Sequence, residues 1–220
     1  NKDTNTSLIK ASKVALDLTG QSLEVSFNSL KSNVEGIDIG ARNLLVGTVT
    51  TKNINVNIKD SYTTFDPYTT NNKKTLSDLG FSVNDEITIS FDWSISKNGS
   101  LSEVYGDFKL EWLGIDSSGV DNRYLGVIKN PVDSFSSTNK LGRVVVTTKL
   151  TSSVMKAHTV RFRIDNSVLK FEVSNMKMER GNKATDWTPA PEDIDSKIEA
   201  NTTSITAVQG QISGLISESS

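Results

Sequence analysis

The chain has 220 residues, 35% of them hydrophobic, and its 24 Lys and Arg nearly balance 26 Asp and Glu, for a net charge of -2. This balance gives no basic footprint for nucleic acid or for an anionic membrane. No apolar run reaches the roughly 18 residues of a membrane-spanning helix, and without Cys the chain forms no disulfide or thiolate zinc site. The polar N-terminus does not read as a signal peptide. We expect a β-rich protein without membrane insertion.

Residues 1–38 carry two short alternations of apolar and polar side chains. Their apolar members are Val14, Leu16, Leu18, Leu23, Val25 and Phe27. A period of two residues is typical of strands with one buried face. We therefore predict a small N-terminal β stem or collar, too short to form a domain by itself.

Residues 39–192 carry strand signals at regular intervals, separated by turn-forming sequences such as Lys-Asn-Gly-Ser. The expected strands cover residues 44–51, 54–58, 87–95, 108–115, 124–128, 143–150, 159–164 and 169–178. About eight strands with no helical period between them favour an antiparallel β-sandwich, most simply a jelly roll. The polar stretch 63–74 is interpreted as a long loop.

The C-terminal segment, residues 193–220, has apolar residues at alternating steps of four and three. The seam consists of Ile194, Ile198, Asn201, Ile205, Val208, Ile212 and Leu215. This is the 3.5-residue period of a coiled coil. Ile at both kinds of seam position favours three strands, and Asn201 can fix their register. We predict a coiled-coil helix that forms a homotrimer.

An amphipathic helix packed on the chain's own surface is the alternative interpretation of this segment. The coiled coil is favoured because the opposite face is polar and because Gly210 and Gly214 each weaken an isolated helix by about 1 kcal/mol. Such a helix needs neighbouring helices to be stable in water. The heptads run to the end of the chain, so we expect this sequence to be part of a longer protein.

Two motifs enclose the β-rich region: residues 40–45, GARNLL, open it, and residues 178–193, MERGNKATDWTPAPED, close it. They resemble the ends of carbohydrate-binding jelly-roll modules in tail proteins of siphophages that infect Gram-positive bacteria. The resemblance covers roughly residues 40–193 and identifies no binding residue. It implies a galactose-binding-like sandwich in a tail fibre, receptor-binding protein or tail-tip protein of the virion tail.

The same resemblance implies the partners of the chain. They are bacterial cell-wall polysaccharide, to which the virion attaches, and other tail proteins. The resemblance allows a structural calcium ion in this type of sandwich, but no ligand spacing in the sequence identifies a metal site. No other cofactor is expected.

Strand phase selects the candidates for saccharide binding. In residues 87–95 the odd positions are apolar and face the core, so the even positions face outwards, and the other strands are sorted in the same way. An exposed aromatic ring can cover the apolar face of a sugar, for which Tyr124 and the cluster 62–68 are suited. The predicted binding residues are Asp92, Glu111, Tyr124, Arg161 and Arg163. The alternative is that the charged ones form cross-strand salt bridges on a solvated sheet.

The sequence gives little support to catalysis. It has no nucleophile elbow, zinc-protease helix or phosphate loop, and its single His158 is expected to be solvated or hydrogen-bonded. Carboxylates such as Asp107 and Glu111 could serve a glycosidase, but any chain of this charge has such pairs on its surface. We therefore expect no enzyme. Two functions remain: saccharide binding in a phage tail, and a structural spacer of a tail fibre that binds no glycan.

Overall fold

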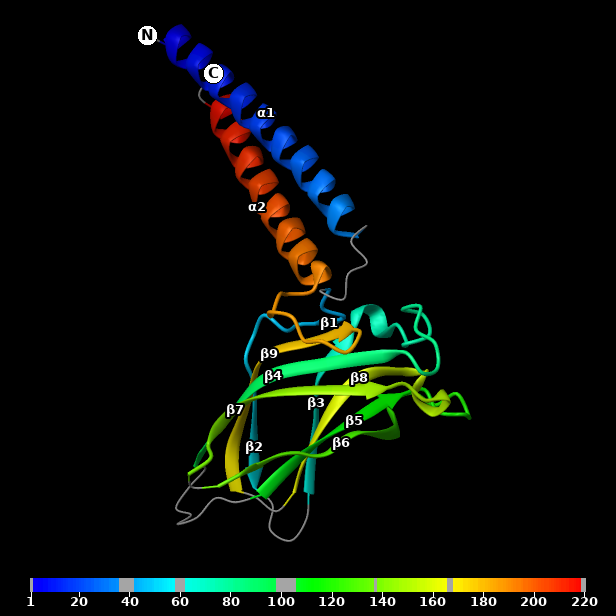
Figure 1. Cartoon of the computed structure of the whole chain (residues 1–220). Coiled ribbons are helices and arrows are strands. Elements are labelled where there is room, and N and C mark those ends of the chain that lie inside the picture. The colour runs from blue at the N-terminus through cyan, green and yellow to red at the C-terminus, as the bar shows by residue number, and fades with distance from the viewer. Residues whose placement is uncertain are drawn as a thin grey trace. The chain divides into compact units, whose positions relative to one another are not determined.

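The computed structural model describes residues 2–35, 42–57, 62–97, 106–136, 138–165 and 168–218 (Figure 1). The chain divides into two compact units. One is Ile39–Ile194, which holds the described strands, and the other combines Asn1–Asp38 with Asp195–Ser220, which hold most of two long helices.

The larger unit has nine described strands in two antiparallel sheets. The five-stranded sheet has the order β1-β3-β8-β5-β6, and the four-stranded sheet has the order β2-β9-β4-β7. The strands are β1 (Leu45–Val46), β2 (Lys52–Asn57), β3 (Tyr62–Thr70), β4 (Glu86–Lys97), β5 (Gly106–Gly114), β6 (Arg123–Phe135), β7 (Leu141–Lys149), β8 (Ala157–Asp165) and β9 (Val168–Arg180). Two 3-10 turns, η1 (Asn71–Lys73) and η2 (Ser152–Val154), lie in the connections.

An aromatic cluster joins the inner faces of the two sheets. Phe91 and Trp93 come from the four-stranded sheet, and Phe108 and Phe162 come from the five-stranded sheet. The ring centroids of Phe91 and Phe162 lie 5.1 Å apart, and those of Trp93 and Phe108 lie 5.5 Å apart. Edge-to-face pairs of this kind add about 0.5–1.5 kcal/mol each to the gain from burial. The predicted antiparallel sandwich and the inward phase of residues 87–95 are confirmed.

The segment 63–74 is mostly strand, so its interpretation as a loop is wrong. It forms most of β3, which pairs with β8 along one side and β1 along the other. Tyr68 points into the core, where its hydroxyl donates a hydrogen bond to the carbonyl of Val173 at 3.3 Å in the opposite sheet. The register of the pairing shifts between Phe65 and Tyr68, around Pro67, which interrupts the alternation on which the sequence prediction depended.

The predicted N-terminal β stem is also wrong, because residues 2–35 form one helix, α1 (Lys2–Glu35). The short alternations concealed a seven-residue repeat of Ile9, Leu16, Leu23 and Leu30. A repeat of seven residues returns to the same side of a helix every two turns, so these side chains form one apolar stripe. Strands would need neighbouring strands to pair with, and the sequence predicts too few of them in this region. Ile9 is 41% exposed, Leu16 48% and Leu23 68%.

The predicted C-terminal helix is confirmed as α2 (Pro191–Glu218). Proline suits the first helical position because the missing N–H has no partner there, and Asp193 brings negative charge to the positive helix end. Its carboxylate also accepts the backbone N–H of Gly47 at 2.8 and 3.0 Å. In the smaller unit, α1 and α2 run in opposite directions, and Gln209 Nε2 donates to Asp17 Oδ1 at 3.2 Å (Figure 1). The side chain of Leu215 lies outside the described residues.

The buried side chain of Asn43 ties the opening motif to the closing motif. Its Nδ2 donates to the carbonyls of Met176 at 2.9 Å and Thr188 at 3.1 Å. Its Oδ1 accepts the backbone N–H groups of Leu45 and Met178, both at 3.1 Å. An amide side chain can donate and accept two hydrogen bonds each, so this one fully buried side chain connects three separate stretches of backbone.

The closing segment, residues 181–190, covers one end of the outer face of the four-stranded sheet. Beneath it lie Lys177 and Glu179, both fully buried. Lys177 Nζ donates to Thr185 Oγ1 at 2.5 Å and to the carbonyl of Asp186 at 2.7 Å. Glu179 accepts the backbone N–H of Thr185 at 2.8 Å. Burial lowers the pKa of Lys177, an effect that the charge of Glu179 opposes.

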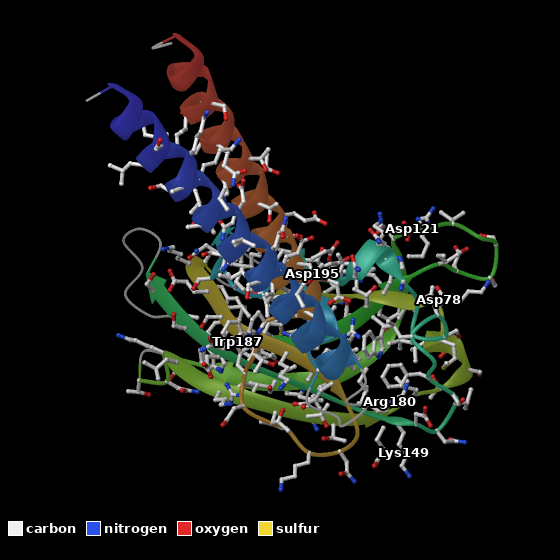
Figure 2. All side chains as sticks on the ribbon, turned by 90° about the horizontal axis from the view of Figure 1, so that it is seen from above. Asp78, Asp121, Lys149, Arg180, Trp187 and Asp195 are labelled. Atoms are coloured by element: carbon white, nitrogen blue, oxygen red, sulfur yellow. The ribbon has the colours of Figure 1, made fainter. Side chains whose placement is uncertain are left out.

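Arg180 and Trp187, labelled in Figure 2, hold the closing segment and the neighbouring loop. The indole Nε1 of Trp187 donates to the carbonyl of Met176 at 3.2 Å. The guanidinium of Arg180 lies 3.9 Å from the ring centroid of Phe81 and donates to Asp85 Oδ2 at 2.9 Å. The residues of the closing motif therefore have structural roles.

We predict that Asn43→Ala destabilises the sandwich by about 1–3 kcal/mol, because buried backbone groups lose their partners. Urea unfolding followed by tryptophan fluorescence measures this, since all three Trp lie in the larger unit. Asn53→Ala, at an exposed position of β2, is the matched control and should change stability by less than about 0.5 kcal/mol. Equal midpoints for the two variants would contradict the role of Asn43.

Candidate functional site

Polar side chains from four strands gather on the outer face of the five-stranded sheet. Cross-strand register places Thr64 opposite Arg163 and Glu111 opposite Arg161, so these residues share that face. The polar face consists of Tyr62, Thr64, Asp66, Lys109, Glu111, Tyr124, Arg161 and Arg163.

An ion pair between Glu111 and Arg161 forms the centre of the polar face. Arg161 Nε lies 2.8 Å and Nη2 lies 2.6 Å from the same carboxylate oxygen, Glu111 Oε2. Glu111 is only 4% exposed, so its carboxylate has little contact with water and Arg161 is its main partner.

An exposed aromatic ring lies beside each of the two arginines. The guanidinium of Arg163 is 3.9 Å from the ring centroid of Tyr62, and that of Arg161 is 5.8 Å from the ring of Tyr124. Tyr62 is 53% exposed and Tyr124 is 51% exposed. Cation–π contact restrains each ring at low entropic cost and leaves part of its surface open to solvent.

Asp66 lies on β3 next to the central ion pair. Although the residue is exposed as a whole, partial desolvation of its carboxyl raises its pKa. The charge of Arg161 lowers this pKa and the charge of Glu111 raises it. A carboxyl in this position accepts hydrogen bonds when ionised and donates one when protonated.

The polar face can hold a polyhydroxylated ligand. Carboxylates accept hydrogen bonds from hydroxyls, guanidinium groups donate to them, and the two tyrosine rings offer flat apolar surfaces at the sides. These are the components that sugar recognition requires: polar groups for the hydroxyls and a ring for the C–H face.

The structure brings together four of the five residues predicted for binding: Glu111, Tyr124, Arg161 and Arg163. Asp92 lies on the other sheet. The prediction grouped it with the other four because strand phase distinguishes inward from outward side chains but does not tell which sheet a strand belongs to. There Arg143 Nη1 donates to Asp92 Oδ1 at 3.0 Å and Asn175 Nδ2 donates to Asp92 Oδ2 at 2.7 Å.

The aromatic cluster at 62–68 divides between the surface and the core. Tyr62 belongs to the polar face, whereas Tyr68 is buried. Asp66 was missed by sequence reasoning, because it lies within the shift of register in β3, between Phe65 and Tyr68. Recognising β3 as a strand would have placed Thr64 on the same face as Arg163. Asp66, two residues further along, would then have been assigned to that face as well.

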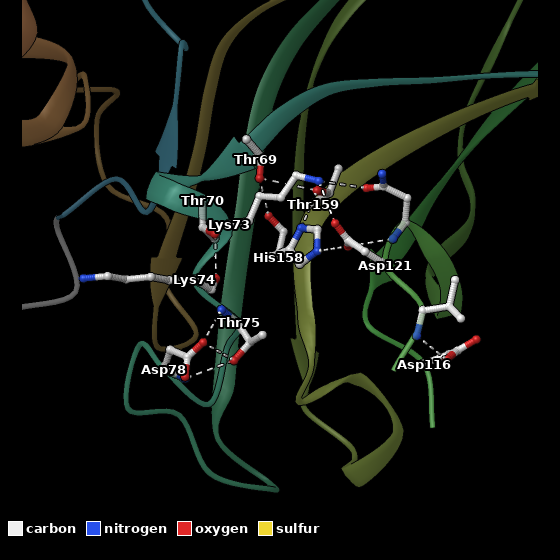
Figure 3. A network of polar contacts seen from close by, with 12 residues as sticks. Thr69, Thr70, Lys73, Lys74, Thr75, Asp78, Asp116, Asp121, His158 and Thr159 are labelled. Carbon is white, nitrogen blue, oxygen red and sulfur yellow. Dashed lines mark hydrogen bonds and ion pairs between the residues drawn. The ribbon is translucent and has the colours of Figure 1, made fainter. Parts of the chain in front are cut away.

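His158 belongs to a separate network on the same sheet (Figure 3). It is 1% exposed, and its Nε2 lies 2.6 Å from Asp121 Oδ1 while Nδ1 lies 2.8 Å from Thr159 Oγ1. Lys73 Nζ, in η1, donates to Asp121 Oδ2 at 2.7 Å. Both imidazole nitrogens are engaged, so His158 holds the Asp121 loop and η1 against β8.

The pKa of the Asp121 carboxyl is held well below its ordinary range. The largest cause is the hydrogen bond from Lys73, and the backbone N–H of Asn122 and the side chain of His158 add to it. Partial desolvation of the carboxyl opposes these effects.

The described residues offer no acidic cluster for a calcium ion: no three His, Asp or Glu side chains within them come together as a metal site. No helix in the described part of the chain has the length and apolar character to cross a membrane.

No protein-family model matches the chain, and no curated protein matches it. Among solved structures it is similar to the tripod (BppUct-A-L) from the baseplate of bacteriophage Tuc2009, with a TM-score of 0.47 and 14% identity over 70% of this chain and 60% of that chain. It is also similar to the CBM22-1 xylan-binding domain of Paenibacillus barcinonensis Xyn10C, with a TM-score of 0.33 and 14% identity over 64% of this chain and 86% of that chain.

A further similar structure is the C-terminal family 22 carbohydrate binding module of Clostridium thermocellum Xyn10B. Its TM-score is 0.35, at 12% identity over 64% of this chain and 89% of that chain. Likenesses at these TM-scores carry no argument about function.

We predict that Asp121→Asn makes the acid destabilisation of the chain shallower. A carboxyl whose pKa is lower in the folded state stabilises the fold above its unfolded pKa of about 4, and this contribution is lost as pH falls. Thermal midpoints between about pH 5 and pH 2 should therefore decrease less steeply in the variant. Lys73→Met removes the hydrogen bond that lowers the pKa of Asp121 most, so it should act in the same direction. If the midpoints of both variants fall with pH as steeply as those of the unmodified chain, this role of Asp121 is contradicted.

Proposed function

We propose that this chain is a host-recognition component of a bacteriophage tail that binds cell-wall saccharide of a Gram-positive bacterium. The observation that carries the binding proposal is the polar face, where two exposed tyrosine rings flank the Glu111–Arg161 pair. Tyr62 is 53% exposed and Tyr124 is 51% exposed, so each ring offers a flat apolar surface against which a sugar ring can pack.

The phage setting is supported by the two motifs that resemble siphophage tail modules. In the structure, Asn43 of the opening motif bonds to Thr188 of the closing motif, and the guanidinium of Arg42 bonds to Glu192. The motifs are therefore parts of one interlocked structure, and their joint occurrence in a sequence reflects a shared way of closing the sandwich. A jelly-roll, galactose-binding-like module in a virion tail, in contact with other tail proteins, is what we propose from them.

The helices support assembly into a homotrimer through a coiled coil. On α2 the seam residues Ile194, Ile205, Val208 and Ile212 are between 38% and 54% exposed in the single chain. The apolar residues of α1, described above, are exposed to a similar degree or more. Complete burial of an exposed Ile or Leu contributes on the order of 1.5–3 kcal/mol, so covering the exposed part of each of these side chains by association of the helices can recover a fraction of that.

We propose no catalytic activity. The single His158 is buried with both nitrogens engaged, and Glu111 is committed to Arg161. A general acid or base needs access to the substrate and a proton to exchange.

A structural spacer that binds no glycan is the second candidate. One observation favours it: the charged groups at the centre of the polar face, Glu111 and Arg161, already satisfy each other without a ligand. A saccharide must then compete with water at a face that is complete by itself.

We predict that Tyr62→Ala and Tyr124→Ala each weaken saccharide binding by roughly two- to tenfold, the value of one aromatic contact. The measurement is calorimetric titration of the full chain with short oligosaccharides prepared from cell-wall polysaccharide of several Gram-positive bacteria. Short ligands report single-site affinity and avoid the avidity of an oligomer.

Val145→Ala, at an exposed position of the four-stranded sheet, is the control for this titration and should bind as the unmodified chain does. Binding of none of the oligosaccharides would favour the spacer. Equal affinity of all variants would place the binding site away from the two tyrosines.

We predict that light scattering gives the full chain a molar mass of three chains. The double variant Ile205→Asp with Ile212→Asp should have the molar mass of a single chain. Charges in an apolar seam are not compensated, so they oppose association. Thr203→Asp with Thr206→Asp, on the polar side of the same helix, should leave the trimer intact. A monomeric unmodified chain at all concentrations would refute this assembly.

A further inference from the structure

The outer face of the four-stranded sheet carries a hollow of about 430 Å³. Its principal lining residues are Asp92, Trp93, Ser94, Leu141, Arg143 and Glu172. The closing segment covers the other end of this face, at Lys177 and Glu179, and leaves the hollow open. Ligand sites in proteins span about 300–1,000 Å³, so the hollow has the size of a site for a small ligand.

The sides of the hollow consist of charged and hydroxyl groups from three adjacent strands. Arg143 of β7 lies opposite Asp92 of β4, and Ser94 of β4 lies opposite Glu172 of β9. Arg143 Nη1 and Asp92 Oδ1 are 3.0 Å apart, and Ser94 Oγ donates to Glu172 Oε2 at 3.1 Å. Donors and acceptors therefore alternate across the hollow.

Gly142 lies opposite Trp93 and shares its inward phase, so the glycine makes room for the indole beneath the floor of the hollow. A Cβ at Gly142 would lie 2.9 Å from the indole Nε1 of Trp93 and 3.3 Å from its Cε2. Trp93 lies directly beneath, and its Nε1 donates to Asp133 Oδ2 at 3.1 Å. Next to the glycine, Leu141 is 72% exposed and supplies an apolar surface at the rim.

The charges at the hollow are paired. Arg143 bonds to Asp92, and Lys170, next to the lining, bonds to Glu172, so the hollow offers no net charge to attract a charged ligand. Lys170 Nζ lies 2.7 Å from Glu172 Oε1, and this hydrogen bond with that of Ser94 lowers the pKa of Glu172, which stays ionised. Ionised carboxylates that keep exposed lone pairs accept hydrogen bonds from neutral hydroxyl groups.

We propose that this hollow binds one ring of a neutral saccharide, with hydroxyls on Asp92, Arg143 and Glu172 and the C–H face on Leu141. The site lies on the opposite sheet from the polar face and shares no residue with it. The module would thus hold saccharide on both of its outer faces, and the second site stands or falls independently of the first.

The test uses the full chain labelled with 5-fluorotryptophan, which gives one fluorine signal for each of the three Trp. Methyl glucoside, methyl galactoside, methyl rhamnoside and N-acetylglucosamine are titrated, with glucuronate and glucosamine as charged comparators. We expect a neutral sugar to shift the signal of Trp93, assigned by Trp93→Phe, and to leave that of Trp112 in place. The charged comparators should need several-fold higher concentrations.

Glu172→Gln and Leu141→Ser should each raise the dissociation constant by about tenfold. Val145→Ser, on the same strand and face as Leu141, is the matched control and should not change it. Absence of a Trp93 shift with every sugar at about 50 mM, or equal affinity of Glu172→Gln, Leu141→Ser and Val145→Ser, overturns the proposal.

The variants Tyr62→Ala and Tyr124→Ala separate the two sites. A Trp93 response that persists in both variants supports a second site, even if oligosaccharide binding at the polar face is lost. A Trp93 response that disappears with them overturns the second site and leaves the polar face as the origin of the effect.

Discussion

The sandwich depends on the hydrogen bonds of one buried amide. Asn43 is fully buried and satisfies backbone groups of the opening strand, of β9 and of the closing segment. Without it, the carbonyls of Met176 and Thr188 would each lose a hydrogen-bond donor, and that of Met176 lies in a buried place. The closing segment lies over Lys177 and Glu179, whose burial is tolerable because they pair with each other at 3.6 Å and because Thr185 and Asp186 supply hydrogen-bond partners. The path of the chain out of the sandwich follows from this set of contacts.

Periodicity in the sequence identified most of the sandwich, since in strands such as β4 the apolar residues alternate and the odd positions from Ile87 to Ile95 are buried. It failed where the pattern was broken or ambiguous. Pro67 interrupts the alternation of β3, so Tyr62 and Asp66 appeared to belong to a loop. In α1 a two-residue alternation and a seven-residue repeat coexist at Leu16 and Leu23, and the longer period decides the structure.

The candidate site was accessible to sequence reasoning only in part. The outward phase of Glu111, Arg161 and Arg163 was correct, and register brings the three together. Asp92 has the same outward phase but lies on the other sheet. The alternation within a strand does not show with which distant strands it pairs, so the sequence could not reveal this. Its partner Arg143 lies 51 residues away along the chain, and no pattern in either strand indicates the pair.

The contacts between the two ends of the sandwich have a consequence for evolution. Asn43 and Gly47, near its start, bond to Thr188 and Asp193, near its end, so the chain enters and leaves the sandwich within hydrogen-bonding distance. A segment whose ends meet can be exchanged for another with the same ends without altering what precedes or follows it. Recombination between genes that share these two motifs would therefore replace the whole sandwich in a single step and leave what lies outside the motifs unchanged.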